Sequence, residues 1–389
     1  MLLDKTIAGK ETARGYGKRR RACLIFRNFG SYGGQANVAI SMARSLERSG
    51  FETTLLCCKK VNNNSTPQNL GESIPVYRQV IFRPWPYELK TYFEFALPAI
   101  SKFFSGIVIN PYTSDILPFA DITYVHYPRT LIIEEKTKNL FWKLYYKPYK
   151  VIERSSSFRG IEKLVLANSH FTADAVKREF RIDPLVLYPP VDIHPFKKET
   201  QKTKKDLVLT ISRFSSEKGL EKIPAVAKSV NAKFVVLGSL FSEELYRKVS
   251  SLIRKNNVSD KVILIPDAPV AVKVEFLKQA KVYFHTAPLE HFGISIIEGM
   301  GAGCIPIVSD SGGPREFVPN MWRYKDEEDA ISKIKSALDS WSPSIGREMT
   351  ATASRFGTEN FEDAFCRILD IYAKEGKVVP RSWKGVGDA

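Results

Sequence analysis

The sequence predicts an α/β protein with two doubly wound parallel-sheet domains, and three observations support this class. Its 389 residues exceed what one core usually holds, so two domains of about 150–200 residues are expected. Short apolar runs alternate with amphipathic helical stretches, a rhythm typical of parallel sheets with helical crossovers. A polar, lysine-rich stretch over 191–205 follows Pro189 and Pro190 and interrupts that rhythm, which then restarts. This stretch is the best domain boundary in the chain.

The first domain is expected over residues 21–195, after a flexible basic lead-in of residues 1–20. This lead-in lacks the apolar segment of a secretory signal, and nowhere does the chain approach the ~18 uninterrupted apolar residues of a membrane-spanning helix. Five cysteines without a CxxC pair indicate a reducing compartment. Strands are predicted at Ala22–Arg27, Phe51–Cys58, Ile122–Tyr127, Leu164–Ser169 and Leu185–Tyr188, and helices at Ala36–Ser49 and His170–Phe180.

A glycine-rich turn that includes Gly33 and Gly34 joins the first predicted strand to the first helix. Strand, glycine loop and helix can aim backbone N–H groups at an anion. The turn is not a GxGxxG motif, and a tight strand-to-helix connection without a ligand explains it equally well. His126 stands at the end of a predicted strand, where it either binds a ligand or serves the packing of the domain.

The second domain is expected over residues 206–358. A C-terminal helix over 359–376 is expected to pack back on the first domain, and 377–389 to form a tail. The predicted strands are Asp206–Ser212, Lys233–Gly238, Lys261–Ile265, Lys281–His285 and Ile305–Ser309. The predicted helices are Glu217–Val230, Glu243–Lys255, Val270–Ala280, Glu327–Leu338 and Asn360–Lys374.

The net charge of +16 is concentrated in the first half, since residues 1–195 hold 28 Lys and Arg against 17 Asp and Glu. This excess suits a nucleic acid, an anionic membrane surface or a phosphorylated substrate, or it is a solvated basic surface. Arg129–Lys163 has nine basic and four acidic residues. Its interleaved aromatics indicate either a membrane-interface helix or a core helix with lysines on its wet face. No nucleic-acid-binding motif is present, so nucleic acid is not expected as a partner.

The stretch from His285 to Val318 supplies the main candidate site. Glu290 stands in a loop, Gly293 opens a short helix, and Glu298 lies more than one turn inside it. The N–H groups of the first helical residues have no acceptor within the helix and can bind phosphate. Two carboxylates beside that anion would accept hydrogen bonds from hydroxyl groups, as a nucleotide sugar requires. The alternative is that both glutamates are solvated surface residues.

Arg213 and Lys218 stand five residues apart, after the first strand of the second domain. An arginine fork and a lysine point charge in such a loop can clamp a diphosphate. His285 and His291 flank Glu290, but no HxxxH or DxD pairing supports a metal, so no metal is expected.

The run EHFGISIIE from Glu290 to Glu298, followed by GMGAGCIPIV and by SGGPRE ending at Glu316, resembles the nucleotide-sugar site of retaining glycosyltransferases of the GT-B fold, family 4. The stretch from Ser212 to Gly219 resembles the diphosphate motif of that family. The segments YVHYP around His126, ANS at 167–169 and YPPVD at 188–192 are most similar to α-1,2-mannosyltransferases that extend dolichol-linked oligosaccharides.

This resemblance implies two Rossmann-like domains with an interdomain cleft, the first for the acceptor and the second for the nucleotide sugar. The implied reaction moves a hexose, mannose, from GDP-mannose to a lipid-linked glycan. The acceptor hydroxyl attacks from the leaving-group face, with no carboxylate nucleophile, unlike most glycosidases. No cofactor or metal is implied. The implied location is cytoplasmic, peripheral on the cytoplasmic face of a membrane with an anionic surface.

The resemblance also assigns roles to residues. Arg213 and Lys218 neutralise the leaving diphosphate, Glu290 holds hydroxyls of the transferred sugar, Glu298 holds the ribose, and His126 contacts the sugar. The expected catalytic residues are therefore His126, Glu290, Arg213 and Lys218. The expected donor-binding residues are Gly33, Gly34, Ser212, Arg213, Lys218, His291, Phe292, Gly293, Ile294, Ser295 and Glu298. The alternatives are a nucleotide-sugar epimerase, a transferase with a soluble acceptor and, more remotely, a basic nucleic-acid-binding protein.

Overall fold

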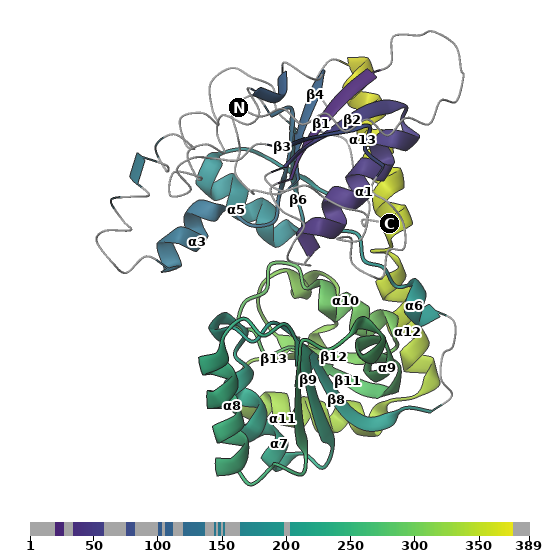
Figure 1. The fold of residues 1–389 in the computed structure, drawn as a ribbon. Coiled ribbons are helices and arrows are strands. Elements are labelled where there is room, and N and C mark those ends of the chain that lie inside the picture. The colour runs from purple at the N-terminus through teal and green to yellow at the C-terminus, as the bar shows by residue number, and fades with distance from the viewer. Residues whose placement is uncertain are drawn as a thin grey trace. The chain divides into compact units, whose positions relative to one another are not determined.

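The computed structural model describes residues 20–26, 34–57, 75–81, 100–102, 106–111, 120–136, 144, 147–148, 151, 164–197 and 203–375. The chain divides into two compact units (Figure 1). Unit 1 contains the residues up to Pro190 together with those from Thr358 onward, and unit 2 is Val191–Gly357. The sequence prediction ended the first domain at residue 195. Val191 lies in unit 2 because its N–H donates to the Phe356 carbonyl at 2.9 Å and it pairs with Gly357.

Unit 1 is built on a seven-stranded sheet in the order β3-β2-β1-β4-β5-β6-β7, with every recorded strand pair parallel. The order reverses between β1 and β4, which makes the sheet doubly wound, as predicted. The strands are β1 Arg20–Ile25, β2 Phe51–Cys57, β3 Arg78–Ile81, β4 Ile107–Asn110, β5 Ile122–Val125, β6 Leu164–Ala167 and β7 Leu185–Val186. The longer helices are α1 Gly34–Arg48, α3 Arg129–Lys136, α5 His170–Phe180 and α13 Thr358–Glu375.

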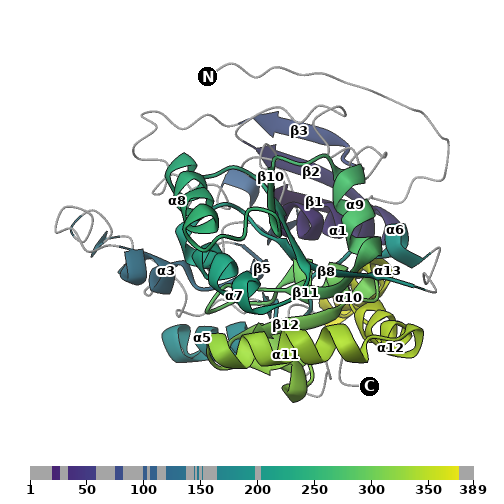
Figure 2. The ribbon, with the colours of Figure 1, turned by 90° about the horizontal axis from the view of Figure 1, so that it is seen from below.

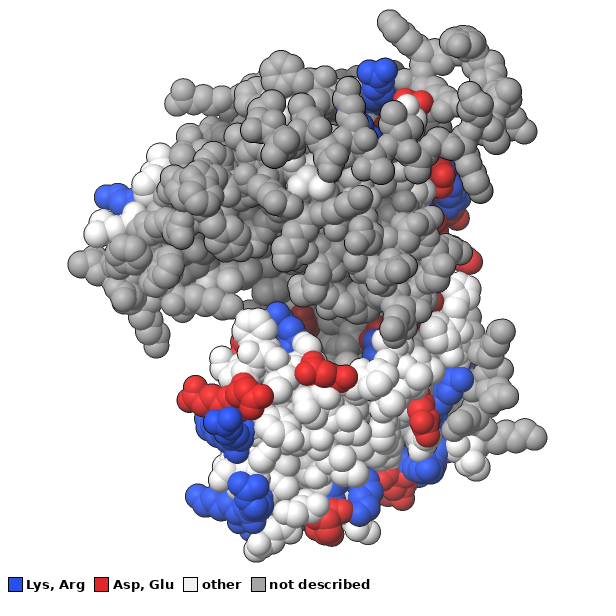
Figure 3. Space-filling view, in the orientation of Figure 1, with Lys and Arg blue, Asp and Glu red and all other residues white. Residues whose placement is uncertain are grey.

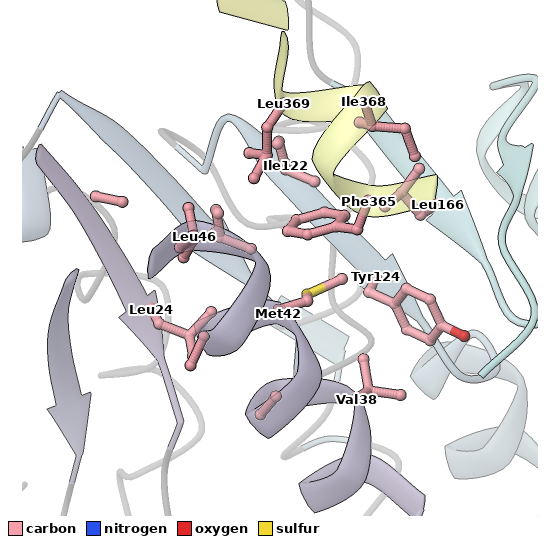
Figure 4. Packing of buried hydrophobic residues seen from close by; sticks show 14 of the residues in the cluster. Leu24, Val38, Met42, Leu46, Ile122, Tyr124, Leu166, Phe365, Ile368 and Leu369 are labelled. Carbon is pink, nitrogen blue, oxygen red and sulfur yellow. The ribbon is translucent and has the colours of Figure 1, made fainter. Parts of the chain in front are cut away.

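The core of unit 1 forms where α1 and the C-terminal helix α13 meet the sheet (Figure 4). Met42 of α1 and Phe365 of α13 are both fully buried in this cluster. Arg48 of α1 adds an ion pair to Asp363 of α13, with 2.6 Å between Nη2 and Oδ1. The last helix therefore belongs to the first unit, because it supplies apolar side chains that close the core over α1.

Unit 2 is built on a six-stranded parallel sheet in the order β10-β9-β8-β11-β12-β13. Helices α7, α8 and α11 lie on one side of this sheet, and α9, α10 and α12 lie on the other (Figure 1). Figure 2 shows the same unit from below, with α11 running along its edge. The strands are β8 Lys205–Ile211, β9 Lys233–Gly238, β10 Val262–Pro266, β11 Ala280–Phe284, β12 Ile305–Ser309 and β13 Arg323–Tyr324. The helices are α6 His194–Lys197, α7 Ile223–Ser229, α8 Glu243–Lys255, α9 Val270–Gln279, α10 Ile294–Gly301, α11 Glu327–Ser340 and α12 Pro343–Ser354.

The predicted helix Glu217–Val230 is wrong in its first half. Two 3-10 turns, Ser216–Lys218 and Leu220–Lys222, precede α7. Gly219 separates them with φ of +63°, and a Cβ there would lie 2.8 Å from the Thr286 carbonyl oxygen. The chain turns here because it approaches the backbone of a neighbouring loop too closely for a side chain.

Several predicted features fall outside the described residues: the lead-in up to residue 19, the tail over 377–389, Gly33, and the aromatic residues of the basic segment between 137 and 150. Within the described ranges, no helix is both long and apolar enough to cross a membrane. On the face of unit 2 in Figure 3, basic and acidic side chains are interspersed, so neither sign dominates that face.

Candidate active site

Three loops meet at the carboxyl edge of the sheet of unit 2, where parallel α/β sheets hold their ligands. They follow the adjacent strands β8, β11 and β12, and together they carry most of the predicted site residues. Ser212 and Arg213 follow β8, the segment from His285 to Gly293 follows β11, and Ser311–Gly313 follows β12.

A pair of glycines fixes the loop that carries Glu290. The Gly313 N–H donates to the Glu290 carbonyl at 2.9 Å. A Cβ at Gly312 would lie 2.1 Å from the Glu290 oxygen, and one at Gly313 would lie 2.1 Å from the His291 oxygen. Gly312 also has φ of +69°, which only glycine adopts easily. The SGG motif therefore acts as a backbone support for the Glu290 loop.

The Glu290 carboxylate is held by two cationic or polar side chains. Lys218 Nζ lies 2.7 Å from Glu290 Oε2, and His285 Nε2 lies 3.2 Å from the same oxygen. The other oxygen, Oε1, accepts the His291 N–H at 3.2 Å. The side chains of Lys218 and Glu290 are each 18% exposed. The structure therefore brings Lys218 and Glu290 together as one ion pair.

Two opposing effects set the pKa of Glu290. Burial raises it, but the hydrogen bond to His285 and the positive charge of Lys218 outweigh burial and leave the pKa well below its usual range. At neutral pH Glu290 is ionised, so its oxygens accept hydrogen bonds and do not donate a proton. Burial also lowers the pKa of the neighbouring His291, which favours its neutral form.

His285 was not predicted as a site residue, yet it orients Glu290. Its side chain is buried, and its ring stacks on Tyr283 with 6.5 Å between centroids. Because its Nε2 faces a carboxylate, that nitrogen carries the hydrogen, and Nδ1 is buried without a hydrogen-bond partner among the described residues. The signal in the sequence was its place directly after a predicted strand, five residues before Glu290.

Arg213 lies at the same edge but belongs to a separate ion pair. Its Nη2 is 3.3 Å from Glu217 Oε1, and its guanidinium lies 5.7 Å from the ring centroid of Phe241. The side chain is 56% exposed, so it is available to a ligand. Ser212 turns the chain at the strand end, where its N–H donates to the Leu237 carbonyl. The sequence prediction missed Phe241, an exposed aromatic in the loop after β9.

Helix α10 begins directly after the Glu290 loop. Gly293 is its N-cap residue with φ of +99°, and a Cβ there would lie 2.5 Å from Ile296 Cδ1. The N–H groups of Ile294 and Ser295 are the first of the helix, where an anion is favoured. The Ser295 side chain also forms a hydrogen bond with the buried Tyr283 hydroxyl. Burial is the main cause of the raised pKa of this phenol, and the nearby charges of Glu298 and Glu290 raise it further.

Glu298 lies in the second turn of α10 and pairs with a residue that was not predicted. Lys273 Nζ of helix α9 is 2.6 Å from Glu298 Oε1. Phe292, predicted to bind the donor, is instead a core residue: its ring packs against Phe317 and Phe356 at about 5.5 Å between centroids. A Cβ at Gly313 would lie 3.0 Å from the Phe292 Cα, so the backbone of Phe292 packs closely against the SGG motif.

His126 belongs to unit 1, immediately after β5. Its Nε2 lies 2.9 Å from the Pro111 carbonyl oxygen, so this nitrogen carries the hydrogen and donates it. The ring also meets Tyr124 edge-on at 5.1 Å. Two glycines were predicted to bind the donor in the first loop. Gly34 is the one that the structure describes, and it is the first residue of α1. Among the described residues, no group of three metal-ligating side chains comes together.

Comparison with known proteins agrees with this architecture. Residues 192–343 match the family described as glycosyl transferases group 1. The structure is similar to that of Anabaena Alr3699/HepE in complex with UDP and glucose, with a TM-score of 0.70, 16% identity, and coverage of 90% of this chain and 99% of that one. It is also similar to WaaG, a glycosyltransferase involved in lipopolysaccharide biosynthesis, with a TM-score of 0.66, 12% identity and coverage of 91% and 99%.

Two curated relatives are named as mannosyltransferases, and each is matched over only part of its length. A Dictyostelium discoideum protein named GDP-Man:Man(3)GlcNAc(2)-PP-Dol alpha-1,2-mannosyltransferase is 25% identical over 265 residues, which cover 60% of this chain and 51% of the relative. The alpha-1,3/1,6-mannosyltransferase ALG2 of Kluyveromyces lactis is 22% identical over 394 residues, covering 83% and 76%. The chain thus spans about half the length of the first of these relatives.

Two parallel-sheet units with these structural neighbours define the GT-B fold, as the sequence predicted. Within that fold, residues 192–343 match the glycosyl transferases group 1 family, and both curated relatives are named as mannosyltransferases.

Proposed function

We propose that this protein is a retaining hexosyltransferase that moves mannose from GDP-mannose to a lipid-linked oligosaccharide. The observation that carries the proposal is the Lys218–Glu290–His285 arrangement beside the start of α10. It places a cation, an ionised carboxylate and helix N–H groups at one edge, which suits a sugar linked to a diphosphate. The choice of mannose and of a dolichol-linked acceptor rests on the names of the relatives.

The leaving diphosphate would be stabilised by fixed positive charge. Arg213 is exposed at the edge of the sheet, and Lys218 is fixed in position by Glu290 and by the Thr286 hydroxyl, which donates to the Lys218 carbonyl at 2.7 Å. The N–H groups of Ile294 and Ser295 add the partial charge of the helix start. Such preorganised donors stabilise charge that develops in the transition state without further rearrangement.

Glu290 would bind hydroxyl groups of the transferred sugar. Its Oε2 already accepts from Lys218 and His285, whereas Oε1 accepts only the His291 N–H in the described structure. A carboxylate oxygen accepts about two hydrogen bonds, so Oε1 has room for a sugar hydroxyl. An oxygen with two donors and a strongly lowered pKa is a poor nucleophile. The acceptor hydroxyl would therefore attack directly, and the departing phosphate oxygen would take its proton.

Unit 1 is the proposed acceptor domain, with His126 contacting the sugar. Its Nε2–H is committed to the Pro111 carbonyl, an arrangement that fixes the ring orientation at the end of β5. The first-half basic excess and the aromatic residues of 141–149 support a peripheral position on the cytoplasmic face of an anionic membrane. No metal is required in this scheme, because Arg213 and Lys218 supply the positive charge.

The proposal is tested by incubating the protein with GDP-mannose or UDP-glucose and lipid-linked oligosaccharide acceptors in detergent or vesicles. Glu290→Gln and Lys218→Met are each expected to lower transfer about 100-fold, the effect of removing one charge-stabilising group. Lys248→Met is the matched control, since Lys248 forms an exposed ion pair with Glu221 on the same unit.

Equal loss of activity in the control and site variants would contradict the site assignment. Conversion of the nucleotide sugar to an epimer, without transfer to any acceptor, would contradict the reaction itself. Transfer only to a soluble glycan would contradict the lipid-linked acceptor.

A further inference from the structure

Lys273 forms an ion pair with Glu298 at the candidate site. Lys273 lies outside the motif from Glu290 to Glu316, so the motif does not explain this pair. The distance between Lys273 Nζ and Glu298 Oε1 is 2.6 Å, and the side chains are 21% and 16% exposed. Removing one partner would leave the other charge largely out of water, which is costly. The pair therefore holds the Glu298 side chain in one orientation.

The position of Lys273 within its helix is unfavourable by local rules. It lies in the first turn and a half of α9, whose start carries no acidic residue. A positive charge near the start of a helix opposes the helix dipole, so a cation is disfavoured there. The dipole thus gives no reason for a lysine at this position, whereas the contact with Glu298 does.

Both residues also lie toward the ligand-binding edge of the sheet. Three residues separate the end of β10 from the start of α9, and α10 starts after the loop that follows β11. The two helices lie on the same side of the sheet (Figure 1). The Tyr283 hydroxyl donates to the Ile211 carbonyl at the end of β8. The charges of Glu298 and Glu290 both contribute to the raised pKa of this phenol, so both carboxylates lie near it.

From this geometry we infer that Lys273 is a positioning residue that orients Glu298 toward the ribose of a nucleoside diphosphate and sets the preference for ribose over deoxyribose. The inference rests on the donor site of the proposed function. Lys273 occupies one lone pair of Oε1, which leaves Oε2 and the rest of Oε1 to accept the two ribose hydroxyls. Without the ammonium, the carboxylate loses its fixed orientation and with it the second hydroxyl contact.

The test is isothermal titration of the protein with a nucleoside diphosphate and its 2′-deoxy form, using whichever of GDP and UDP the wild type binds more tightly. The wild type is expected to prefer the ribonucleotide. Lys273→Met is expected to weaken ribonucleotide binding about tenfold, a loss typical of one well-formed hydrogen bond to a charged group. Binding of the 2′-deoxy form should change little, so the preference collapses.

Two further variants separate orientation from general loss of charge. Lys273→Arg keeps a cation beside Glu298 and is expected to retain most of the preference. Lys278→Met removes a lysine from the same helix, five residues on and about 140° around its axis, and is expected to bind like the wild type.

Three results would overturn the inference: unchanged ribonucleotide affinity in Lys273→Met, an equal loss for both nucleotides, or the same loss in Lys278→Met. If Lys273→Met does not fold, Lys273→Gln and Glu298→Gln are combined in a double-mutant cycle. Their losses of ribonucleotide affinity should then be strongly non-additive, and additive losses would refute the coupling. Because binding alone is measured, a protein that binds nucleotide with this preference but transfers no sugar would refute only the proposed reaction.

Discussion

Replacing Gly312 by alanine tests how strictly the SGG turn positions Glu290. Gly312 has φ of +69° and ψ of −159°, a region that essentially only glycine occupies, at a cost of about 1–3 kcal/mol for other residues. The new Cβ would lie 2.1 Å from the Glu290 carbonyl oxygen. Carbon–oxygen contacts in proteins start at about 3.3 Å, so the Glu290 loop must move by about 1 Å.

A displacement of about 1 Å in a positioning loop can lower turnover about 100-fold. We expect Gly312→Ala to fold, with a thermal midpoint lowered by about 2–4 °C for each kcal/mol lost. The proposed mannose transfer should fall about 100-fold. The assays are thermal unfolding followed by circular dichroism and kcat/KM for the nucleotide sugar.

Gly50→Ala is the matched control. Gly50 also has a positive φ, +78°, but a Cβ there would meet nothing within 4 Å. Backbone strain in unit 1 should lower the free energy of unfolding of this variant by about 1–2 kcal/mol. Its activity should stay at the wild-type level. If Gly312→Ala transferred mannose as well as Gly50→Ala, the SGG turn would not position Glu290, and our reading of the motif would be refuted.

Further predictions concern charge, thiols and one aromatic residue. The pKa of Glu290 is lowered by folding, so its ionised form stabilises the protein above the unfolded pKa of about 4.3, and this contribution is lost as pH falls through the folded pKa. The stability difference between wild type and Glu290→Gln in urea unfolding should therefore shrink as pH falls below about 4.3, and a constant difference would contradict it. Burial raises the pKa of the Cys304 thiol. It also raises the pKa of the Cys23 thiol, to about 11. Mass spectrometry should therefore show that iodoacetamide alkylates both thiols only as fast as the protein opens. Phe241→Ala should raise KM for the nucleotide sugar about two- to fivefold, because a cation–π contact at an exposed site contributes about 0.5–1 kcal/mol, and an unchanged KM would show that the ring does not hold Arg213.

Much of the fold could be predicted because strong local signals agree with the tertiary structure. The helices His170–Phe180 and Glu243–Lys255 and the strand Ile305–Ser309 have the predicted bounds. Both long helices start after serine N-caps whose hydroxyls accept an N–H from the first turn. Where capping residue, apolar period and turn signal coincide, the local sequence determines the element.

Other elements could not be predicted because distant contacts decide them. The chain breaks at Gly219 into two 3-10 turns because the loop after β11 lies against it. Helix α12 has a serine cap and Pro343 in its first turn, but its apolar stripe is weak, and it forms by packing on α10. These are tertiary effects that no window of sequence contains.

For the candidate site, the sequence by itself determined which chemistry gathers after β8 and β11: a cation pair, two glutamates and a glycine-opened helix. Only the tertiary structure decided which partners they take. It paired Lys218 with Glu290 across 72 residues and Lys273 with Glu298 across 25, added the buried His285, and moved the Phe292 side chain into the core. Motifs specify residue types along the chain, whereas charge pairing depends on which strand ends lie side by side, and the strand order of the sheet sets that.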